Sequence, residues 1–252
     1  MGMAIRTKNA FSVISDPDSF NPDWNPADLK RCEVFTYSGI GGNMMIGESS
    51  SIAIASPTLV DGTPFAEFTS YGATVPHLRL AMTDGELQTW ILLFDPNNST
   101  LQRLIMSSYA GTSDAQHPGI SVVINENGQL GLFMGRQNVS TLAYSSQFVP
   151  LSAFNSTKPM LLAVTLNGKT CTIKDLTNNL SNSGTLSSDY QRSYGPEIYV
   201  GKGPNGTYGN AAGKNRIASY MVFDRVLTDT ELAEIHAYLL MAIQDRFPDI
   251  TF

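Results

Sequence analysis

The stretch RIASYMVFDRVLTDTELAEI, residues 216–235, joins a strand-like segment to a helix-like segment with almost no linker. Arg216–Phe223 alternates in the way that a β-strand requires, because successive side chains of a strand point to opposite faces. The alternation predicts one face made of Ile217, Met221 and Phe223 and an opposite face made of Ala218, Tyr220 and Val222.

The second half of the stretch has the signals of a helix start. Thr228 is placed as an N-cap, and Glu231 three residues later completes a capping box, with Leu227 and Leu232 at the positions of a hydrophobic staple. An apolar stripe at helical spacing follows, and Phe247-Pro248 ends it. The sequence therefore predicts one amphipathic C-terminal helix over 229–246, docked on a β-structure.

The rest of the chain from residue 43 reads as short strands separated by turns. Asn125–Gly128 and Asn167-Gly168 are hairpin signals, because Asn and Gly tolerate the positive φ of tight turns. No repeat and no βαβ alternation is present, so an all-β sandwich is predicted. The strands expected before residue 216 are Leu78–Ala81, Gln88–Phe94, Gly119–Ile124, Gln129–Met134, Met160–Leu166, Lys169–Lys174 and Ile198–Val200.

Residues 1–42 differ from the rest, because prolines punctuate them and apolar residues occur without a period. Proline disfavours a helix before it and cannot donate to a sheet ladder. We interpret 1–42 as an extended N-terminal arm anchored by Phe20 and Trp24. The arm packs on its own domain or crosses to a neighbouring subunit, and the first alternative is favoured.

Composition excludes several classes of protein. The 252-residue chain has 15% charged residues, a net charge of −6 and a pI of about 5.0. A nucleic-acid partner would need a basic face, and no Lys/Arg cluster provides one. No apolar run is long enough to span a bilayer, and MGMAIRTKNAF (1–11) lacks the apolar region of a signal peptide. We therefore expect synthesis in a host cytoplasm, where Cys32 and Cys171 are predicted to be free buried thiols.

Four segments in order resemble the concanavalin A-like lectin/glucanase superfamily, in particular laminin G-like domains of bacterial and phage proteins. They are QTWILLFDP (88–96), GISVVINENGQLGL (119–132), KPMLLAVTLNGKTCTI (158–173), and IYVGKGPNG (198–206) together with the stretch at 216–235. The resemblance implies a jelly-roll-like two-sheet antiparallel β-sandwich over 43–252, with the arm before it and the helix at its end.

Catalytic and metal-binding patterns are not found in the sequence. The glutamates lack the spacing of the paired carboxylates that glycosidases need, and no Gly-x-Ser-x-Gly elbow occurs. Asp95, Asn97 and Asn98 share one loop, and we interpret them as turn formers rather than calcium ligands. No catalytic residue, metal or cofactor is predicted.

Two loops supply the residue types that lectins use, namely aromatic rings for the apolar face of a sugar and amides for its hydroxyls. QRSYGPE (191–197) and PNGTYGN (204–210) could equally be plain surface loops, but loops on a rigid sandwich are where binding residues usually lie. The candidate ligand-binding residues are Tyr190, Arg192, Tyr194, Asn205, Tyr208 and Asn210.

Two functions remain open at this point. One is a non-catalytic module of a phage-type virion component, a decoration or tail appendage, that recognises a glycan or a cell surface. The other is a purely structural virion decoration protein with protein–protein contacts alone. Either way we expect a homo-oligomer on a virion, with other virion proteins as partners and neither nucleic acid nor membrane among them.

Overall fold

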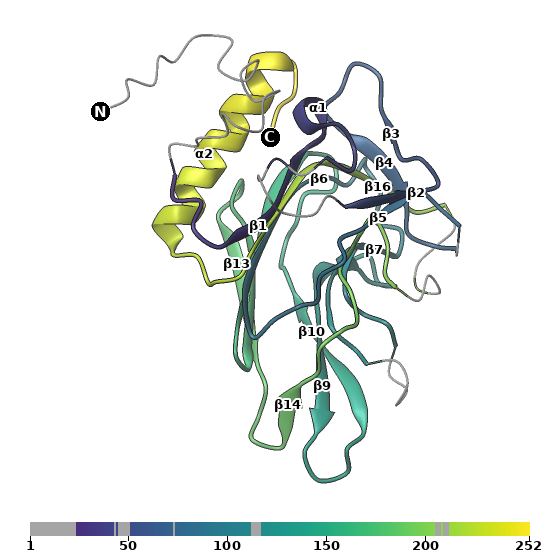
Figure 1. Cartoon of the computed structure of the whole chain (residues 1–252), viewed down its shortest axis with the longest axis vertical. Coiled ribbons are helices and arrows are strands. Elements are labelled where there is room, and N and C mark those ends of the chain that lie inside the picture. Colours follow the sequence, from purple (N-terminus) through teal and green to yellow (C-terminus); the bar gives the residue numbers. More distant parts are fainter. Residues whose placement is uncertain are drawn as a thin grey trace.

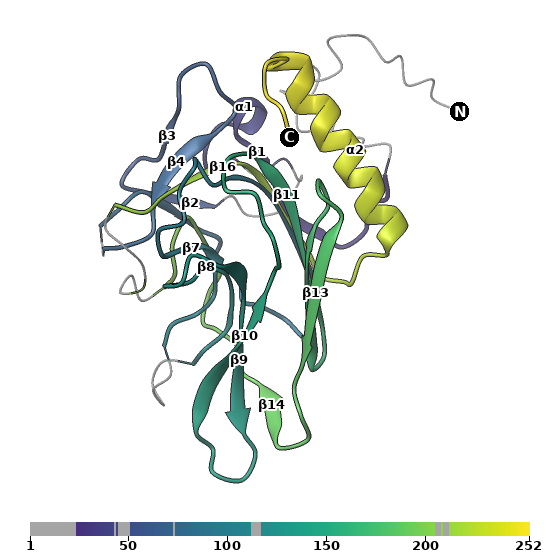
Figure 2. The same cartoon turned by 180° about the vertical axis from the view of Figure 1, so that it is seen from behind.

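The computed structural model describes residues 24–42, 44, 51–72, 74–111, 117–204, 208 and 212–252. In this part of the chain two antiparallel sheets lie face to face, and one long helix covers the outside of one of them (Figures 1 and 2). The predicted two-sheet antiparallel sandwich with a C-terminal helix is confirmed. None of the described helices combines the length and apolarity needed to cross a lipid bilayer.

The sheet beneath the helix, sheet A, is centred on β6 and β16. Its strand order is β13 (Leu180–Thr185), β12 (Thr170–Asp175), β11 (Met160–Asn167), β6 (Leu87–Asp95), β16 (Lys214–Phe223), β4 (Ala66–Thr69) and β3 (Thr58–Leu59). One edge of β16 pairs with two strands in succession, with β4 along 214–217 and with β1 (Leu29–Val34) along 219–223.

The opposite sheet, sheet B, carries the candidate site. Its strand order is β10 (Tyr144–Pro150), β9 (Leu130–Asn138), β8 (Ile120–Ile124), β7 (Arg103–Ser107), β15 (Tyr199–Val200), β5 (His77–Arg79) and β2 (Ile52–Ile54). One edge of β9 is also shared, because β8 pairs with 130–134 and the short β14 (Tyr190–Arg192) pairs with 136–138.

The main core fills the space between the sheets. Strand alternation places one set of apolar side chains inward, such as Leu162 and Val164 of β11 opposite Val122 and Leu132 of sheet B. The β11–β12 hairpin turns at Gly168, where φ is +57°. This agrees with the Asn-Gly turn signal in the sequence, because glycine adopts positive φ at no steric cost.

A second core lies between sheet A and α2 (Asp229–Arg246). The helix buries Leu232, Ile235, Leu239 and Ile243 against outward-facing side chains of β6 and β11. The Thr228 side chain accepts a hydrogen bond from the Glu231 backbone N–H, and the Glu231 carboxylate accepts one from the Thr228 backbone N–H at 2.8 Å. The predicted helix, its bounds and its capping box are confirmed.

The predicted faces of β16 are wrong beyond residue 218. Ile217, Tyr220 and Val222 belong to the core between the sheets, whereas Ala218, Met221 and Phe223 face the helix. The register between β16 and β6 shifts between Ile217 and Ser219. This bulge inserts one residue, and one extra residue reverses the face of every side chain after it.

Part of the predicted arm belongs to the sandwich. Trp24 is buried in the second core, with its ring 5.8 Å from Phe223 and 5.9 Å from Tyr238. β1 and the short α1 (Phe35–Ser38) follow it, so sheet A contains residues on both sides of the predicted boundary at 42/43. Phe20 lies outside the described residues.

The two cysteines are free and buried, as predicted. Cys171 lies in the core between the sheets and Cys32 in the core beneath the helix. Sheet A therefore separates the two thiols, and burial raises the pKa of Cys171 to about 11. A thiol that stays protonated is a poor nucleophile and a poor metal ligand.

Candidate functional site

The candidate ligand-binding residues lie on opposite faces of sheet B. Tyr190 packs against the core between the sheets, so it lies on the inner face. Tyr208 contacts Phe133, whose neighbours Leu132 and Met134 point inward, so Tyr208 lies on the outer face. The structure therefore separates Tyr208 from Tyr190. Asn205 and Asn210 lie outside the described residues.

The inner-face group sits where sheet B extends beyond sheet A. Figures 1 and 2 show the ends of β9, β10 and β14 projecting away from the rest of the sandwich, at the end opposite α2. We call this projection the lobe: residues 136–138 of β9, 144–147 of β10, and β14. Arg136 and Asn138 continue the inward face of Leu132 and Met134 in β9, and they pair directly with Arg192 and Tyr190 of β14.

Arg136 is the centre of the lobe. Its guanidinium carbon lies 4.2 Å from the centre of the Tyr190 ring, a cation–π contact. Its Nε donates to the Ser145 hydroxyl at 2.9 Å, and its Nη1 reaches the Gln147 side-chain oxygen at 3.5 Å. Arg136, Tyr190, Ser145 and Gln147 are all only half-buried, so this polar group remains accessible to solvent.

Arg192 has a structural role. Its Nη2 lies 3.0 Å from an oxygen of Asp84, and the two side chains are 2% and 0% exposed. The other Asp84 oxygen accepts the Gly195 N–H at 2.7 Å, and Arg192 Nη1 donates to the Gly85 carbonyl at 3.1 Å. Burial raises the pKa of Asp84 to about 6, while the charge of Arg192 opposes that rise. The pair fastens β14 to the β5–β6 turn and is not accessible to a ligand.

We call the group of Arg192, Asp84 and Gly195 the corner, and Tyr194 is held in place by it. The Arg192 guanidinium carbon lies 4.9 Å from the centre of the Tyr194 ring, while 41% of Tyr194 stays exposed. The next residue, Gly195, approaches Ser108 so closely that an added Cβ would lie 1.8 Å from the Ser108 carbonyl oxygen. Tyr194 therefore stands at the surface beside the lobe on a fixed backbone.

Tyr208 belongs to an aromatic cluster on the outer face of sheet B. Phe133 is its centre, with the ring of Phe148 at 5.3 Å, Tyr208 at 5.7 Å and Tyr109 at 6.3 Å. Burial raises the pKa of the Tyr208 hydroxyl. Because these rings contact one another, much of their apolar surface is already used to cover the sheet.

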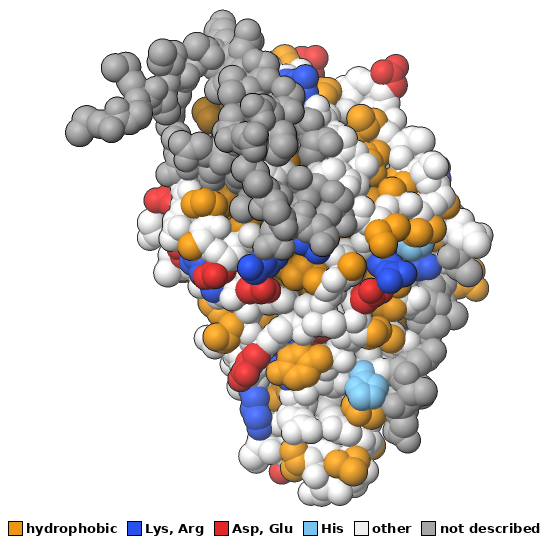
Figure 3. Space-filling model, viewed as in Figure 1, with side chains coloured by type: hydrophobic (Ala, Val, Ile, Leu, Met, Phe, Trp, Pro, Cys, Tyr) orange, Lys and Arg blue, Asp and Glu red, His pale blue; other side chains and the backbone are white. Residues whose placement is uncertain are grey.

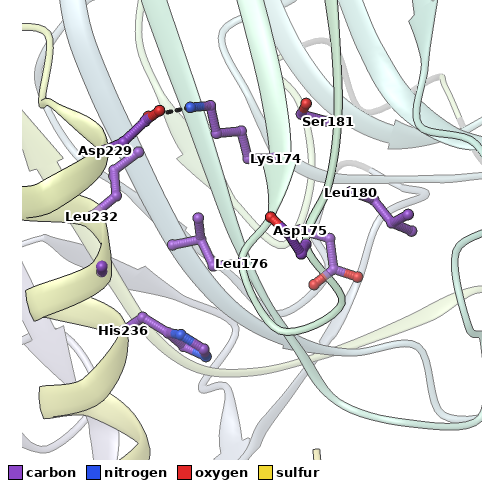
Figure 4. A pocket seen from close by; sticks show the side chains of 10 residues that line it. Lys174, Asp175, Leu176, Leu180, Ser181, Asp229, Leu232 and His236 are labelled. Carbon is purple, nitrogen blue, oxygen red and sulfur yellow. Dashed lines mark hydrogen bonds and ion pairs between the residues drawn. The ribbon is translucent and has the colours of Figure 1, made fainter.

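A pocket of about 310 Å³ lies between the start of α2 and the β12–β13 turn (Figure 4). Lys174 and Asp229 form an ion pair across it. Asp175 accepts hydrogen bonds from the backbone of Thr177 and Asn178. His236 points into the pocket, and burial lowers its pKa while Asp175 opposes this. Lys174 thus connects β12 to the helix, and Asp175 holds the β12–β13 turn in shape.

In the oxygen-rich loop after β6, the guanidinium of Arg103 occupies the carbonyl oxygens. Asp95 accepts the Asn97 N–H at 2.7 Å, as in an Asx turn. The buried Arg103 donates to the carbonyl oxygens of Pro96, Ser99 and Leu101. Within the described part of the chain, no three His, Cys, Asp or Glu side chains are grouped so that they could hold a metal ion.

The surface charges agree with the low charge content. Figure 3 shows acidic and basic side chains interspersed over one face of the molecule, among many uncharged ones. On the described part of this face, the basic side chains do not gather into one broad patch.

Three residues of the lobe were not predicted from the sequence: Arg136, Ser145 and Gln147. A signal for Arg136 was present, because Leu130, Leu132 and Met134 predict an inward face that Arg136 continues. An arginine at an inward position either is a buried charge or lies at the rim of an opening between the sheets. Ser145 and Gln147 gave no signal, since β10 is polar and its alternation is weak.

Comparisons with solved structures identify the fold. The binding domain of botulinum neurotoxin DC in complex with SialylT matches with a TM-score of 0.52 and 14% identity, over 75% of this chain and 46% of that one. The binding domain of serotype D/C VPI 5993 matches with 0.52 and 12% identity, over 75% and 48%. The binding domain of serotype D matches with a TM-score of 0.50 and 13% identity, over 75% of this chain and 46% of that one.

These likenesses show a shared β-sandwich. This chain spans about half the length of the matched neurotoxin chains. Neither a protein-family model nor a curated protein matches the sequence.

Proposed function

We propose that this chain is a non-catalytic recognition module that binds a glycan or a cell-surface carbohydrate in the lobe. The observation that carries the proposal is the half-exposed group of Arg136, Tyr190, Ser145 and Gln147 on rigid strands. An arginine, a hydroxyl and an amide bind sugar hydroxyls, and a tyrosine ring contacts the apolar face of a sugar. Sites on strands hold such groups more accurately than mobile loops do.

The fold supports the same function. The matched binding domain of neurotoxin DC is in complex with SialylT. The sequence also resembles laminin G-like domains of the lectin superfamily. Tyr194, exposed beside the lobe, extends the proposed surface, whereas Arg192 supports it from within.

A phage-type virion component remains part of the proposal. The sequence resemblance supports it, together with low charge content and a Pro-punctuated N-terminal segment. In this setting the module is a decoration or tail appendage, forms a homo-oligomer and contacts other virion proteins. If no glycan binds, the purely structural role replaces recognition.

A glycan array tests the function, with the purified chain assayed in calcium and again in a chelator. We expect reproducible binding, weakened about fivefold by Tyr194→Ala, because an aromatic contact contributes about 1 kcal/mol. Tyr208→Ala on the outer face is the matched control and should leave binding unchanged. If the folded wild-type protein bound no glycan on the array, the proposed function would be rejected.

A further inference from the structure

We infer that the bound glycan carries a carboxylate and that Arg136 is the residue that recognises it. The inference rests on the proposed function and narrows it to acidic sugars. At one rung of the β9–β14 ladder, two arginines lie directly opposite each other.

Arg136 and Arg192 form that rung, and only one of them has a carboxylate. Asp84 pairs with Arg192 at 3.0 Å, while Arg136 makes no ion pair with any described residue. Like charges directly opposite in an antiparallel pair are unfavourable. One uncompensated positive charge therefore remains in the lobe, and an anion placed there would relieve it.

The guanidinium of Arg136 is fixed in one orientation before any ligand arrives. The Tyr190 ring lies against it, Ser145 accepts from Nε, and Gln147 lies near Nη1. No described residue accepts from Nη2 of this half-buried side chain. A guanidinium that is held in this way loses little side-chain entropy when it binds, which favours affinity.

A carboxylate suits this donor better than a hydroxyl does. The planar guanidinium offers parallel N–H groups that match two carboxylate oxygens, and such charge-assisted hydrogen bonds are the stronger kind. The chain as a whole carries a net charge of −6, so an acidic ligand is repelled by much of its surface. An unpaired arginine supplies the local attraction that such a ligand needs.

Sialic acids and uronic acids both provide a carboxylate on a sugar ring, so two probes separate these sources. The experiment measures affinity by calorimetry for a sialylated trisaccharide, for a uronate oligosaccharide, and for the neutral counterpart of each. Wild type, Arg136→Gln and Arg79→Gln are compared. Arg79 is the control, because it is a sheet B arginine that already pairs with Glu197 at 2.7 Å. Its replacement by Gln removes the same charge as Arg136→Gln does.

We expect at least one acidic probe to bind more tightly than its neutral counterpart. Arg136→Gln should weaken that acidic probe about tenfold or more, since a hydrogen bond to a charged group contributes roughly 1.5–3 kcal/mol. The variant should leave neutral probes unchanged, and Arg79→Gln should match wild type.

The outcomes separate this inference from the function on which it rests. Equal affinity for acidic and neutral probes, or an Arg136→Gln variant that binds like Arg79→Gln, would overturn the carboxylate assignment and leave glycan recognition standing. If neither these probes nor the array showed binding to the folded wild-type protein, the function itself would fail. Melting temperatures of both variants exclude misfolding as the cause of any loss.

Discussion

The corner around Arg192 and the lobe around Arg136 lie on two sides of the same ladder rung, yet their environments are opposite. In the corner, the ion pair of Arg192 and Asp84 is almost completely withdrawn from water. In the lobe, Arg136 has a ring and two neutral acceptors and stays half-exposed.

The difference shows how one residue type serves two purposes in one strand pair. A buried charge must be paired, because an unpaired one loses its hydration without compensation. A half-exposed charge keeps part of its hydration and tolerates a missing partner. The corner therefore contributes to the fold, and the lobe keeps an accessible positive charge, which we propose is used for binding.

The largest loss of stability is expected when the ion pair of the corner is removed. Asp84→Asn leaves the Arg192 charge buried without a carboxylate, so the free energy of unfolding should fall by roughly 3–5 kcal/mol. Urea denaturation at neutral pH measures this loss. A loss below about 1 kcal/mol would mean that the corner is as open to water as the lobe.

A smaller effect is expected from filling the close approach in the corner. Gly195→Ala places a Cβ 1.8 Å from the Ser108 carbonyl oxygen, so the backbone has to move. Overpacking of this kind costs about 1–3 kcal/mol, which thermal unfolding detects. Gly168→Ala is the matched control, because its Cβ meets nothing nearer than 3.9 Å and tests positive φ alone.

Glu33 offers a third case beside Arg192 and Arg136, because it is a buried carboxylate without an ion-pair partner among the described residues. The Tyr220 hydroxyl donates to it at 2.5 Å and the Gly41 N–H at 3.0 Å. Burial raises the pKa of Glu33 above 4.5. The folded state then holds the proton more tightly than the unfolded state, so this stabilisation is full below pH 4.5 and is lost as pH rises through the raised pKa.

The stability difference between wild type and Glu33→Gln should therefore decrease as pH rises from 4 to 7. Denaturant titrations of both proteins across this range measure it. A difference that grows with pH would contradict this, because it would show that folding lowers the pKa of Glu33 and stabilises its charged form.

The smallest effect is expected in the lobe. Arg136→Gln should change the free energy of unfolding by no more than about 1 kcal/mol, because half-exposed charges without an ion pair contribute little. The same denaturation assay measures it beside Asp84→Asn. A loss of several kcal/mol would make Arg136 a structural residue like Arg192.

Much of the fold could be predicted from the sequence, because the relevant signals are local. β6 and β11 are apolar, the turns at Asn125–Gly128 and Asn167-Gly168 are compatible with positive φ, and the helix carries its own cap. Polar β10, β13 and β14 were missed, since tertiary pairing rather than composition makes them strands. The bulge in β16 was missed too, because register depends on the partner strand.

Less of the candidate site could be predicted. Aromatic and amide residues in the loops drew attention to Tyr190, Tyr194 and Tyr208, but strand alternation in the pairing partner decides which face each occupies. Arg192 looked like a ligand contact in the sequence, and its partner Asp84 is more than a hundred residues away. The importance of Arg136 follows from the pairing of β9 with β14, which the sequence does not specify.

NMR mapping of a bound acidic glycan tests whether recognition occurs in the lobe. Amide and methyl resonances would be assigned and followed as the glycan is added. We expect the largest shifts to cluster in residues 134–147 and 190–194, around Arg136. Shifts centred on Tyr208, Phe133 and Phe148 across the sheet would contradict it.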